Sequence, residues 1–333
     1  MTEGAYIFAP SGPDLTQEES RFFAKADPWG FILFARNCVD PGQLRRLTAD
    51  LRTSVGRDAP ILIDQEGGRV QRMRAPHWRE WLPPLDQASW SNARRAMYLR
   101  GRLIGQELMD HGIDVNCAPS ADIAWPETHP FLRNRCYGTT ATQVIEMATA
   151  CAEGHLDAGC LTVLKHAPGH GRATVDSHEG LPQIDVPLAE LQTTDFAPFA
   201  SLADVGMAMT AHIVLPEIDP NTPVTLSEPG IGFLRKNIGL NGLMMTDDIS
   251  MGALSGNVAD RSAQALAAGC DLVLHCNGDF AEMEQIVEAT GKMTAEAQNR
   301  ADIALSRRRT PTDIDISALE AEFKSLIEGA ENA

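Results

Sequence analysis

Short apolar runs that alternate with amphipathic stretches constrain the fold of this chain more than any other feature of its sequence. Each run has the length of one strand and lacks polar alternation, as in parallel strands that are buried on both faces. Helical patterns follow most runs, and such alternation is typical of a parallel sheet. The runs are Ala5–Ala9, Gly30–Ala35, Pro60–Ile63, Ile113–Cys117, Leu161–Leu164, Gly206–Met209, Leu243–Thr246 and Asp271–Cys276.

Eight such units predict an α/β fold of the (β/α)8 barrel type, and the strand count leaves a doubly wound open sheet as the alternative. Barrels of this kind often exceed about 200 residues as one domain. We therefore expect one catalytic barrel domain over 1–333, with C-terminal helices from about residue 295 packing on it. The predicted helices are Thr16–Ala26, Pro41–Val55, Asn92–Asp110, Thr142–Ala158, Leu188–Leu202, Ser227–Asn237, Asp260–Ala268, Phe280–Thr290, Ala295–Arg308 and Ile316–Ile327.

The net charge of −17 argues against nucleic acid and anionic membrane surfaces as partners, because both repel an acidic protein. Residues Met1–Pro10 contain neither Lys nor Arg and no long apolar run, so we expect no signal peptide. The seven cysteines are scattered and form no CxxC pair, which fits a reducing compartment. We expect a cytoplasmic protein whose partner is a small molecule. The sequence gives no oligomeric state.

Carboxylates directly follow two of the predicted strands, where barrel enzymes carry their active sites. Asp247 and Asp248 follow the seventh run, and one of them could face the barrel mouth as a nucleophile or could instead cap the following turn. Asp64 follows the third run, where its carboxylate could accept hydrogen bonds from sugar hydroxyls. The glycines at 67–68 permit a tight turn that returns Arg72 to the rim.

Basic residues and histidines follow the fifth run. Lys165 and His166 end this run, and a lysine there can donate to hydroxyls or carboxylates. Asp176 precedes His178 by two residues in a glycine-flanked loop, so it could orient the imidazole as a general acid/base, although an exposed loop histidine is the simpler interpretation. With His170, these histidines also allow a zinc site, although no HxH or HExxH motif is present.

Three segments together resemble the glycoside hydrolase family 3 β-N-acetylhexosaminidases, in the single-domain bacterial branch that recycles peptidoglycan. The segments are IDQEGGRVQR at Ile63–Arg72, KHAPGHG with VDSH at Lys165–His178, and TDDISM at Thr246–Met251. The likeness extends from Gly30 to Asn277. Ala167 replaces the usual aromatic residue and Thr246 replaces the usual serine. The change at Ala167 touches no catalytic role.

The resemblance implies a retaining exo-β-N-acetylglucosaminidase that works through a covalent glycosyl-enzyme. Asp247 would be the nucleophile, His178 the acid/base and Asp176 its dyad partner. The substrate would be a muropeptide, N-acetylglucosamine linked β-1,4 to 1,6-anhydro-N-acetylmuramic acid with or without peptide. No cofactor and no metal are expected. The residues that would hold the N-acetylglucosamine are Asp64, Arg72, Arg135, Lys165 and His166.

Two other functions fit the same residues. One is a metal-dependent hydrolase that uses His166, His170 and His178, which a chelator would inactivate. The other is a sugar-binding barrel without catalysis, which the presence of both Asp247 and His178 makes the weaker interpretation.

Overall fold

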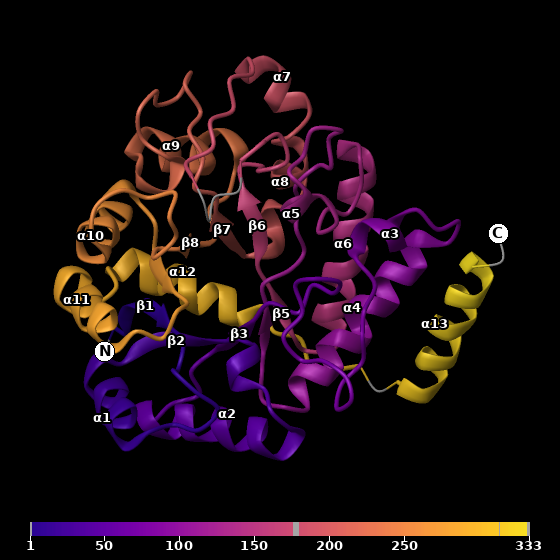
Figure 1. Cartoon of the computed structure of the whole chain (residues 1–333), viewed down its shortest axis with the longest axis horizontal. Helices are drawn as coiled ribbons and strands as arrows, with labels where there is room; N and C mark the ends of the chain where they lie inside the picture. The colour runs from indigo at the N-terminus through magenta and orange to yellow at the C-terminus, as the bar shows by residue number, and fades with distance from the viewer. Residues whose placement is uncertain (1, 176–179, 313, 332–333) are drawn as a thin grey trace.

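The computed structural model describes residues 2–175, 180–312 and 314–331. Within these residues, nine strands form one sheet with helices around it (Figure 1). Each pair of hydrogen-bonded neighbours in the sheet is parallel. The strands are β1 (Gly4–Phe8), β2 (Pro28–Leu33), β3 (Ile61–Ile63), β4 (Val115–Asn116), β5 (Leu161–Thr162), β6 (Leu164–Ala167), β7 (Met207–Thr210), β8 (Leu243–Asp248) and β9 (Leu272–His275).

One chain segment closes this sheet into a barrel. The strand order is β5-β4-β3-β2-β1-β9-β8-β7-β6, and only Val163 separates the two end strands along the chain. The N–H of Val163 donates to the Asn116 carbonyl on one side (3.0 Å), while Leu164 pairs with Ala208 on the other. If β5 and β6 are counted as one interrupted strand, the barrel has eight strands. The predicted (β/α)8 barrel is therefore confirmed, and the open doubly wound sheet is wrong.

Most of the predicted helices begin and end close to their predicted boundaries, with α9 continued by a π-helical turn over Leu234–Ile238. Local capping explains several of the starts. Thr16 and Glu19 form a capping box at α1, and Asp40 caps α2 with Pro41 in its first turn. In the described part of the chain, no helix is both long and apolar enough to cross a membrane. The helices are α1 (Gln17–Ala26), α2 (Pro41–Val55), α3 (Pro84–Ala88), α4 (Ala93–Met109), α5 (Pro130–Arg133), α6 (Ala141–Asp157), α7 (Leu188–Thr193), α8 (Ala197–Ser201), α9 (Glu228–Phe233), α10 (Val258–Ala268), α11 (Phe280–Thr290), α12 (Ala295–Ser306) and α13 (Ile316–Glu331).

The single helix predicted over Leu188–Leu202 is wrong, because two short helices replace it. The backbone leaves the helical region at Thr194 (φ −120°, ψ −93°). The Asp195 carboxylate there accepts hydrogen bonds from Trp125 Nε1 (3.0 Å) and Arg172 Nε (2.7 Å). Pro198 then lacks the N–H that a continuous helix would need. The tertiary contacts of Asp195 therefore override the apolar period of this stretch.

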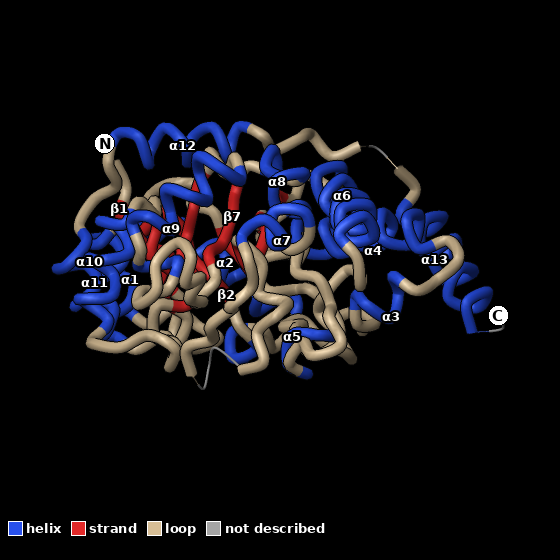
Figure 2. The backbone as a smooth tube through the Cα atoms, turned by 90° about the horizontal axis from the view of Figure 1, so that it is seen from above, coloured by secondary structure: helices blue, strands red, loops and turns tan. Residues whose placement is uncertain are grey.

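Two apolar clusters pack against the strands, one inside the barrel and one around its outer face. Side chains that point into the barrel form one cluster with Ala297, Ala301 and Ala304 of α12, and side chains on the outer faces of the strands pack against the helices. In Figure 2, α12 lies across one end of the barrel, and many of the connecting loops gather at the other end. The open end of the barrel is therefore the one at the carboxyl ends of the strands. That the whole of 1–333 is a single domain stays a prediction.

Candidate active site

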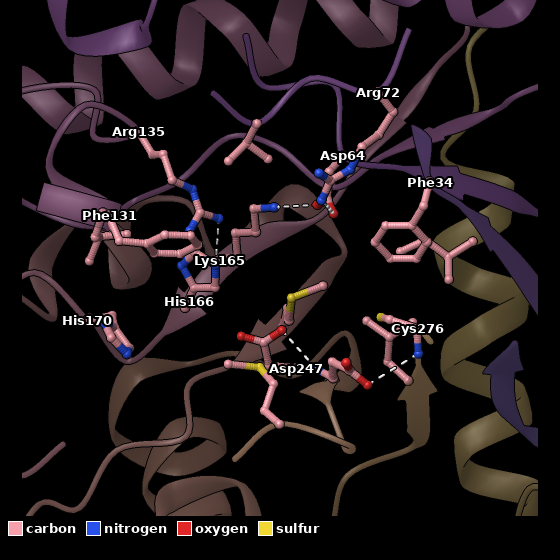
Figure 3. Close-up of a pocket in the computed structure, with 17 residues that line it drawn as sticks. Phe34, Asp64, Arg72, Phe131, Arg135, Lys165, His166, His170, Asp247 and Cys276 are labelled. Carbon is pink, nitrogen blue, oxygen red and sulfur yellow. Dashed lines mark hydrogen bonds and ion pairs between the residues drawn. The ribbon is translucent and has the colours of Figure 1, made fainter. Parts of the chain in front are cut away.

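A cavity opens at the carboxyl ends of the strands, and side chains from many segments line it (Figure 3). Together with the solvent at its mouth, the cavity has a volume of about 740 Å³. Its lining combines charged and apolar side chains. The lining residues are Ile32, Phe34, Asp64, Val70, Arg72, Phe131, Leu132, Arg135, Lys165, His166, His170, Met209, Asp247, Asp248, Met251, Leu274 and Cys276.

Asp64 is held between two cations. Its Oδ1 accepts from Lys165 Nζ (2.7 Å), and its Oδ2 accepts from Arg72 Nη2 (2.9 Å). Burial alone would raise the pKa of this carboxyl, but Lys165 and Arg72 together lower the pKa well below its ordinary range. Asp64 is therefore ionised at neutral pH, with lone pairs left to accept hydrogen bonds from a ligand.

Glu66 binds Lys165 as well, and it also binds Arg135, the third of these cations. It is 1 % exposed, and its carboxylate accepts two hydrogen bonds from the Arg135 guanidinium, both of 2.9 Å. Lys165 Nζ lies 2.5 Å from Glu66 Oε1. Although burial opposes ionisation, Arg135 and Lys165 lower the pKa of Glu66 to about 2. Lys165 thus bridges Asp64 and Glu66. Burial alone would lower the pKa of Lys165, but these two carboxylates outweigh it and raise the pKa.

The turn after β3 returns the chain to the cavity as the glycines predict. Gly67 has φ +101° and Gly68 has φ +59°, values that favour glycine. The Gln65 side chain then closes the loop, because its Oε1 accepts from the N–H of Arg72 (2.9 Å) and of Met73 (3.1 Å). This closure directs Arg72 towards Asp64.

His166 is oriented by a buried aspartate. Its Nδ1 lies 2.7 Å from Asp122 Oδ2, and its Nε2 lies 3.2 Å from Arg135 Nη2. A neutral imidazole with its proton on Nδ1 satisfies both contacts. Asp122 Oδ1 also accepts from the His170 N–H (2.6 Å), so one carboxylate fixes the start and the end of this loop. Despite its burial, the nearby histidines lower the pKa of Asp122 to about 2.

Asp247 and Asp248 differ in what they contact. The Asp247 carboxyl faces the cavity and accepts one hydrogen bond from the Asp248 N–H (2.8 Å) (Figure 3). Burial works against ionisation of Asp247, but the His166 and His212 rings, this N–H and Lys165 lower its pKa. The Asp248 carboxylate instead accepts from the Ser250 N–H and hydroxyl and from the Cys276 N–H. It therefore ties the end of β8 to the loop after β9.

The structure brings six of the sequence-predicted site residues to one cavity, namely Asp64, Arg72, Arg135, Lys165, His166 and Asp247. Asp176 and His178 lie outside the described residues. Asp122, which contacts His166, and the cavity-lining residues Phe34 and Phe131 were not predicted from the sequence. Phe34 follows β2 at the rim, a position that could have marked it as a candidate. Phe131 lies in the short helix α5, where its ring centroid is 5.2 Å from the guanidinium carbon of Arg135, and no such signal marks it.

The chain matches the glycosyl hydrolase family 3 N terminal domain over residues 10–308. That match spans strands β2 to β9 of the barrel and each motif at its mouth. The chain belongs to glycosyl hydrolase family 3. The resemblance seen in the sequence is thereby confirmed, and this family 3 chain is a glycoside hydrolase.

Curated relatives of this family 3 chain carry one common description. A protein from Methylobacillus flagellatus described as a beta-hexosaminidase is 36% identical over 290 residues, which are 83% of this chain and 81% of the relative. Another beta-hexosaminidase, from Methylococcus capsulatus, is 32% identical over 329 residues and covers 97% of both chains. The similarity therefore extends over nearly the full length of a relative.

Solved structures give the same family. Native NagZ from Neisseria gonorrhoeae has a TM-score of 0.83 at 29% identity, covering 99% of this chain and 97% of that one. A family 3 beta-N-acetylglucosaminidase from Paenibacillus sp. str. FPU-7 has a TM-score of 0.85 at 28% identity. The alignment with the Paenibacillus enzyme covers 98% of this chain and 67% of that one.

The zinc alternative finds no support in the described geometry of this family 3 barrel. Both ring nitrogens of His166 already face protein groups, Asp122 and Arg135. Across residues 2–175, 180–312 and 314–331, no group of three His, Cys, Asp or Glu side chains is placed to hold a metal ion. His178, the third ligand of that hypothesis, lies outside these ranges.

Proposed function

We propose that the protein is a retaining exo-β-N-acetylglucosaminidase that removes N-acetylglucosamine from the non-reducing end of peptidoglycan fragments. The relatives from Methylobacillus and Methylococcus are described as beta-hexosaminidases, and the Paenibacillus structure as a beta-N-acetylglucosaminidase. The observation that carries the proposal is one ionised carboxylate, Asp247, across a small cavity from a cluster of fixed charges.

Asp247 is the proposed nucleophile. Its lowered pKa keeps it ionised, and its carboxyl faces the cavity, as attack on an anomeric carbon requires. An oxygen of Asp247 forms a bond to that carbon while the bond to the leaving sugar oxygen breaks. The resulting glycosyl ester is hydrolysed by water, and the two displacements together retain the anomeric configuration.

The charged cluster on the opposite wall is the proposed sugar-binding site. Lys165, Arg72 and Arg135 supply N–H donors, and Asp64 supplies carboxylate oxygens between two of these cations. Vicinal hydroxyls can both donate and accept, so adjacent cations and carboxylates match a sugar ring. His166 completes this set beside Arg135.

His178 is the proposed acid/base, with Asp176 as its partner. The leaving sugar oxygen needs a proton in the first displacement, and the attacking water must lose one in the second. A histidine can do both near neutral pH. This assignment rests on the family motif VDSH, because both residues lie outside the described part of the chain.

The natural substrate is proposed to be N-acetylglucosamine linked β-1,4 to 1,6-anhydro-N-acetylmuramic acid, with or without its peptide, in the cytoplasm. The support is the family resemblance together with a cavity whose lining carries the charged groups Asp64, Arg72 and Lys165, which can bind sugar hydroxyls. Deletion of the gene should leave uncleaved disaccharide–peptides in the cell extract. Unchanged levels of these fragments would contradict this role.

The test of the activity compares two aryl glycosides. 4-Nitrophenyl N-acetyl-β-glucosaminide should be hydrolysed, while 4-nitrophenyl β-glucoside, which lacks only the acetamido group, should react far more slowly. NMR of the first product formed should show the β-anomer. Preferential glucoside hydrolysis or an initial α-anomer would overturn the proposal.

A further inference from the structure

Arg100 of α4 is a fully buried cation behind the candidate active site. It is 0 % exposed, and neutral oxygens accept its hydrogen bonds. Nη1 donates to Gln87 Oε1 (2.7 Å), while Nη2 donates to the backbone carbonyls of Glu66 and Leu82. Burial of a cation among neutral acceptors costs free energy. Arg100 is therefore better explained by the groups that it holds in position than by a gain in the free energy of folding.

The Glu66–Gly67 peptide is the part of the site that Arg100 holds. A Cβ added to Gly67 would lie 1.9 Å from Arg100 Nη2, so only glycine fits while the guanidinium stays in place. The carbonyl that accepts from Nη2 belongs to Glu66, whose carboxylate binds Arg135 and Lys165 on its other side. Arg100 thus sets the backbone from which Glu66 reaches the two cations of the cavity wall.

Trp81 supports Arg100 and the glycine turn at the same time. The Arg100 guanidinium carbon lies 5.6 Å from the centroid of the Trp81 indole, within the range of a cation–π contact. The Trp81 carbonyl accepts from the Gly68 N–H (2.8 Å). Trp81 is 4 % exposed, so a displacement of its ring would reach both Arg100 and the turn.

Helix α13 also packs on Trp81. The ring centroid of Phe323 lies 5.4 Å from that of Trp81, and Glu320 accepts from Arg79 (2.6 Å), whose guanidinium also lies over the indole. Figure 1 shows α13 at the edge of the molecule, beyond α4. The family 3 match ends at residue 308, so α13 lies outside it.

We propose that Arg100 is a positioning residue for the saccharide site, and that α13 strengthens its hold by packing Phe323 on Trp81. The proposal rests on the proposed sugar-binding role of Lys165 and Arg135. Arg100 acts through Glu66. Loss of its hydrogen bonds should let the Glu66 carboxylate shift and so misplace Arg135 and Lys165. A displacement of about 1 Å in a site can lower the rate roughly 10²-fold.

The experiment replaces Arg100 by an apolar side chain of similar length. For Arg100→Met, we expect the Kd for N-acetylglucosamine and the KM for its 4-nitrophenyl glycoside to rise together, by about 10- to 100-fold. Arg100→Lys should recover part of the binding because it restores a donor. A merely structural role would lower the folded fraction, and thus apparent kcat, with Kd and KM unchanged.

A second pair of variants tests α13. Phe323→Ala should raise Kd and KM in the same direction by about 3-fold or more. Glu322→Gln is the matched control. Glu322 lies on the same helix as Phe323, but its carboxylate pairs with Arg95 of α4 and not with Trp81. This control should bind N-acetylglucosamine as the wild type does. The pair also decides the matter if Arg100→Met fails to fold.

Equal Kd values for wild type and Arg100→Met, or equal shifts for Phe323→Ala and Glu322→Gln, would overturn this proposal alone. A wild-type protein that binds no N-acetylglucosamine would overturn the proposed function, and this proposal with it. The two failures are therefore distinguishable by the wild-type titration.

Discussion

The Nδ1 atom of His166 lies 2.7 Å from Oδ2 of Asp122, a carboxylate that is fully buried. Because Nδ1 donates to this carboxylate, the Nε2 lone pair is free to accept from Arg135 (3.2 Å). The buried aspartate therefore orients both the imidazole and, through it, the guanidinium that faces the cavity.

Asp122→Asn should lower kcat/KM by roughly 10- to 100-fold, because an amide holds the imidazole less strongly and less specifically than a carboxylate. Ser120→Ala is the control, since it removes a hydroxyl that donates to the Asp122 carboxylate (3.0 Å) and accepts from the Asp122 N–H (3.3 Å) but leaves the carboxylate in place. It should retain most of the activity. Wild-type kcat/KM in a folded Asp122→Asn protein would contradict an orienting role.

The strands could be predicted from the sequence because buried parallel strands are apolar on both faces. Asp64, Lys165 and Asp247 could be predicted for a related reason, since each directly ends such a run. Asp122 could not, because it reaches His166 across 44 residues from an irregular segment. The Glu66–Arg135 pair likewise spans 69 residues, and no local pattern encodes that contact.

The two adjacent aspartates should respond differently to the same change. Asp247→Asn should lower turnover by about 10⁴-fold or more while the protein folds normally, because the amide cannot form the glycosyl ester. Asp248→Asn should have a smaller effect, since the amide oxygen can still accept from Ser250 or Cys276.

Trapping with a 2-fluoro or 5-fluoro sugar shows directly which of the two aspartates forms the glycosyl ester. Mass spectrometry of the digested protein should place the label on Asp247. A label on Asp248 would reverse the assignment.

Glu66 should make the folded protein sensitive to acid. Its pKa falls from an ordinary 4.5 to about 2 on folding, so the stabilisation is complete above about pH 5 and is lost as pH falls towards 2. The loss should be of the order of 3 kcal/mol in the free energy of unfolding. Urea unfolding at a series of pH values measures it.

Glu66→Gln isolates this contribution from those of the other buried carboxylates. The variant should be less stable than the wild type at neutral pH, because Arg135 and Lys165 lose a charged partner. Its stability should fall less steeply between about pH 5 and pH 2. Parallel pH profiles for the two proteins would show that Glu66 contributes no such sensitivity.

His178 should matter most when the leaving group is a poor one. A sugar alkoxide must be protonated as it departs, whereas a nitrophenolate leaves without a proton, and general acid assistance is typically worth about 10²–10⁴-fold. His178→Ala should therefore lose cleavage of the natural disaccharide but keep glycosylation by an activated aryl glycoside. Hydrolysis of the glycosyl-enzyme should then limit turnover. Azide should accelerate turnover, because it attacks the glycosyl-enzyme in place of water.

Asp176→Ala should fall between wild type and His178→Ala, because it removes the orienting charge but keeps the imidazole. The measurement for both variants is kcat/KM across aryl glycosides of graded leaving-group pKa. The slope should be steeper for His178→Ala than for the wild type, since an unprotonated leaving group carries more negative charge in the transition state. Identical slopes would mean that another residue donates the proton, and the next candidates would be Glu179 of the same sequence segment and His170, which lines the cavity.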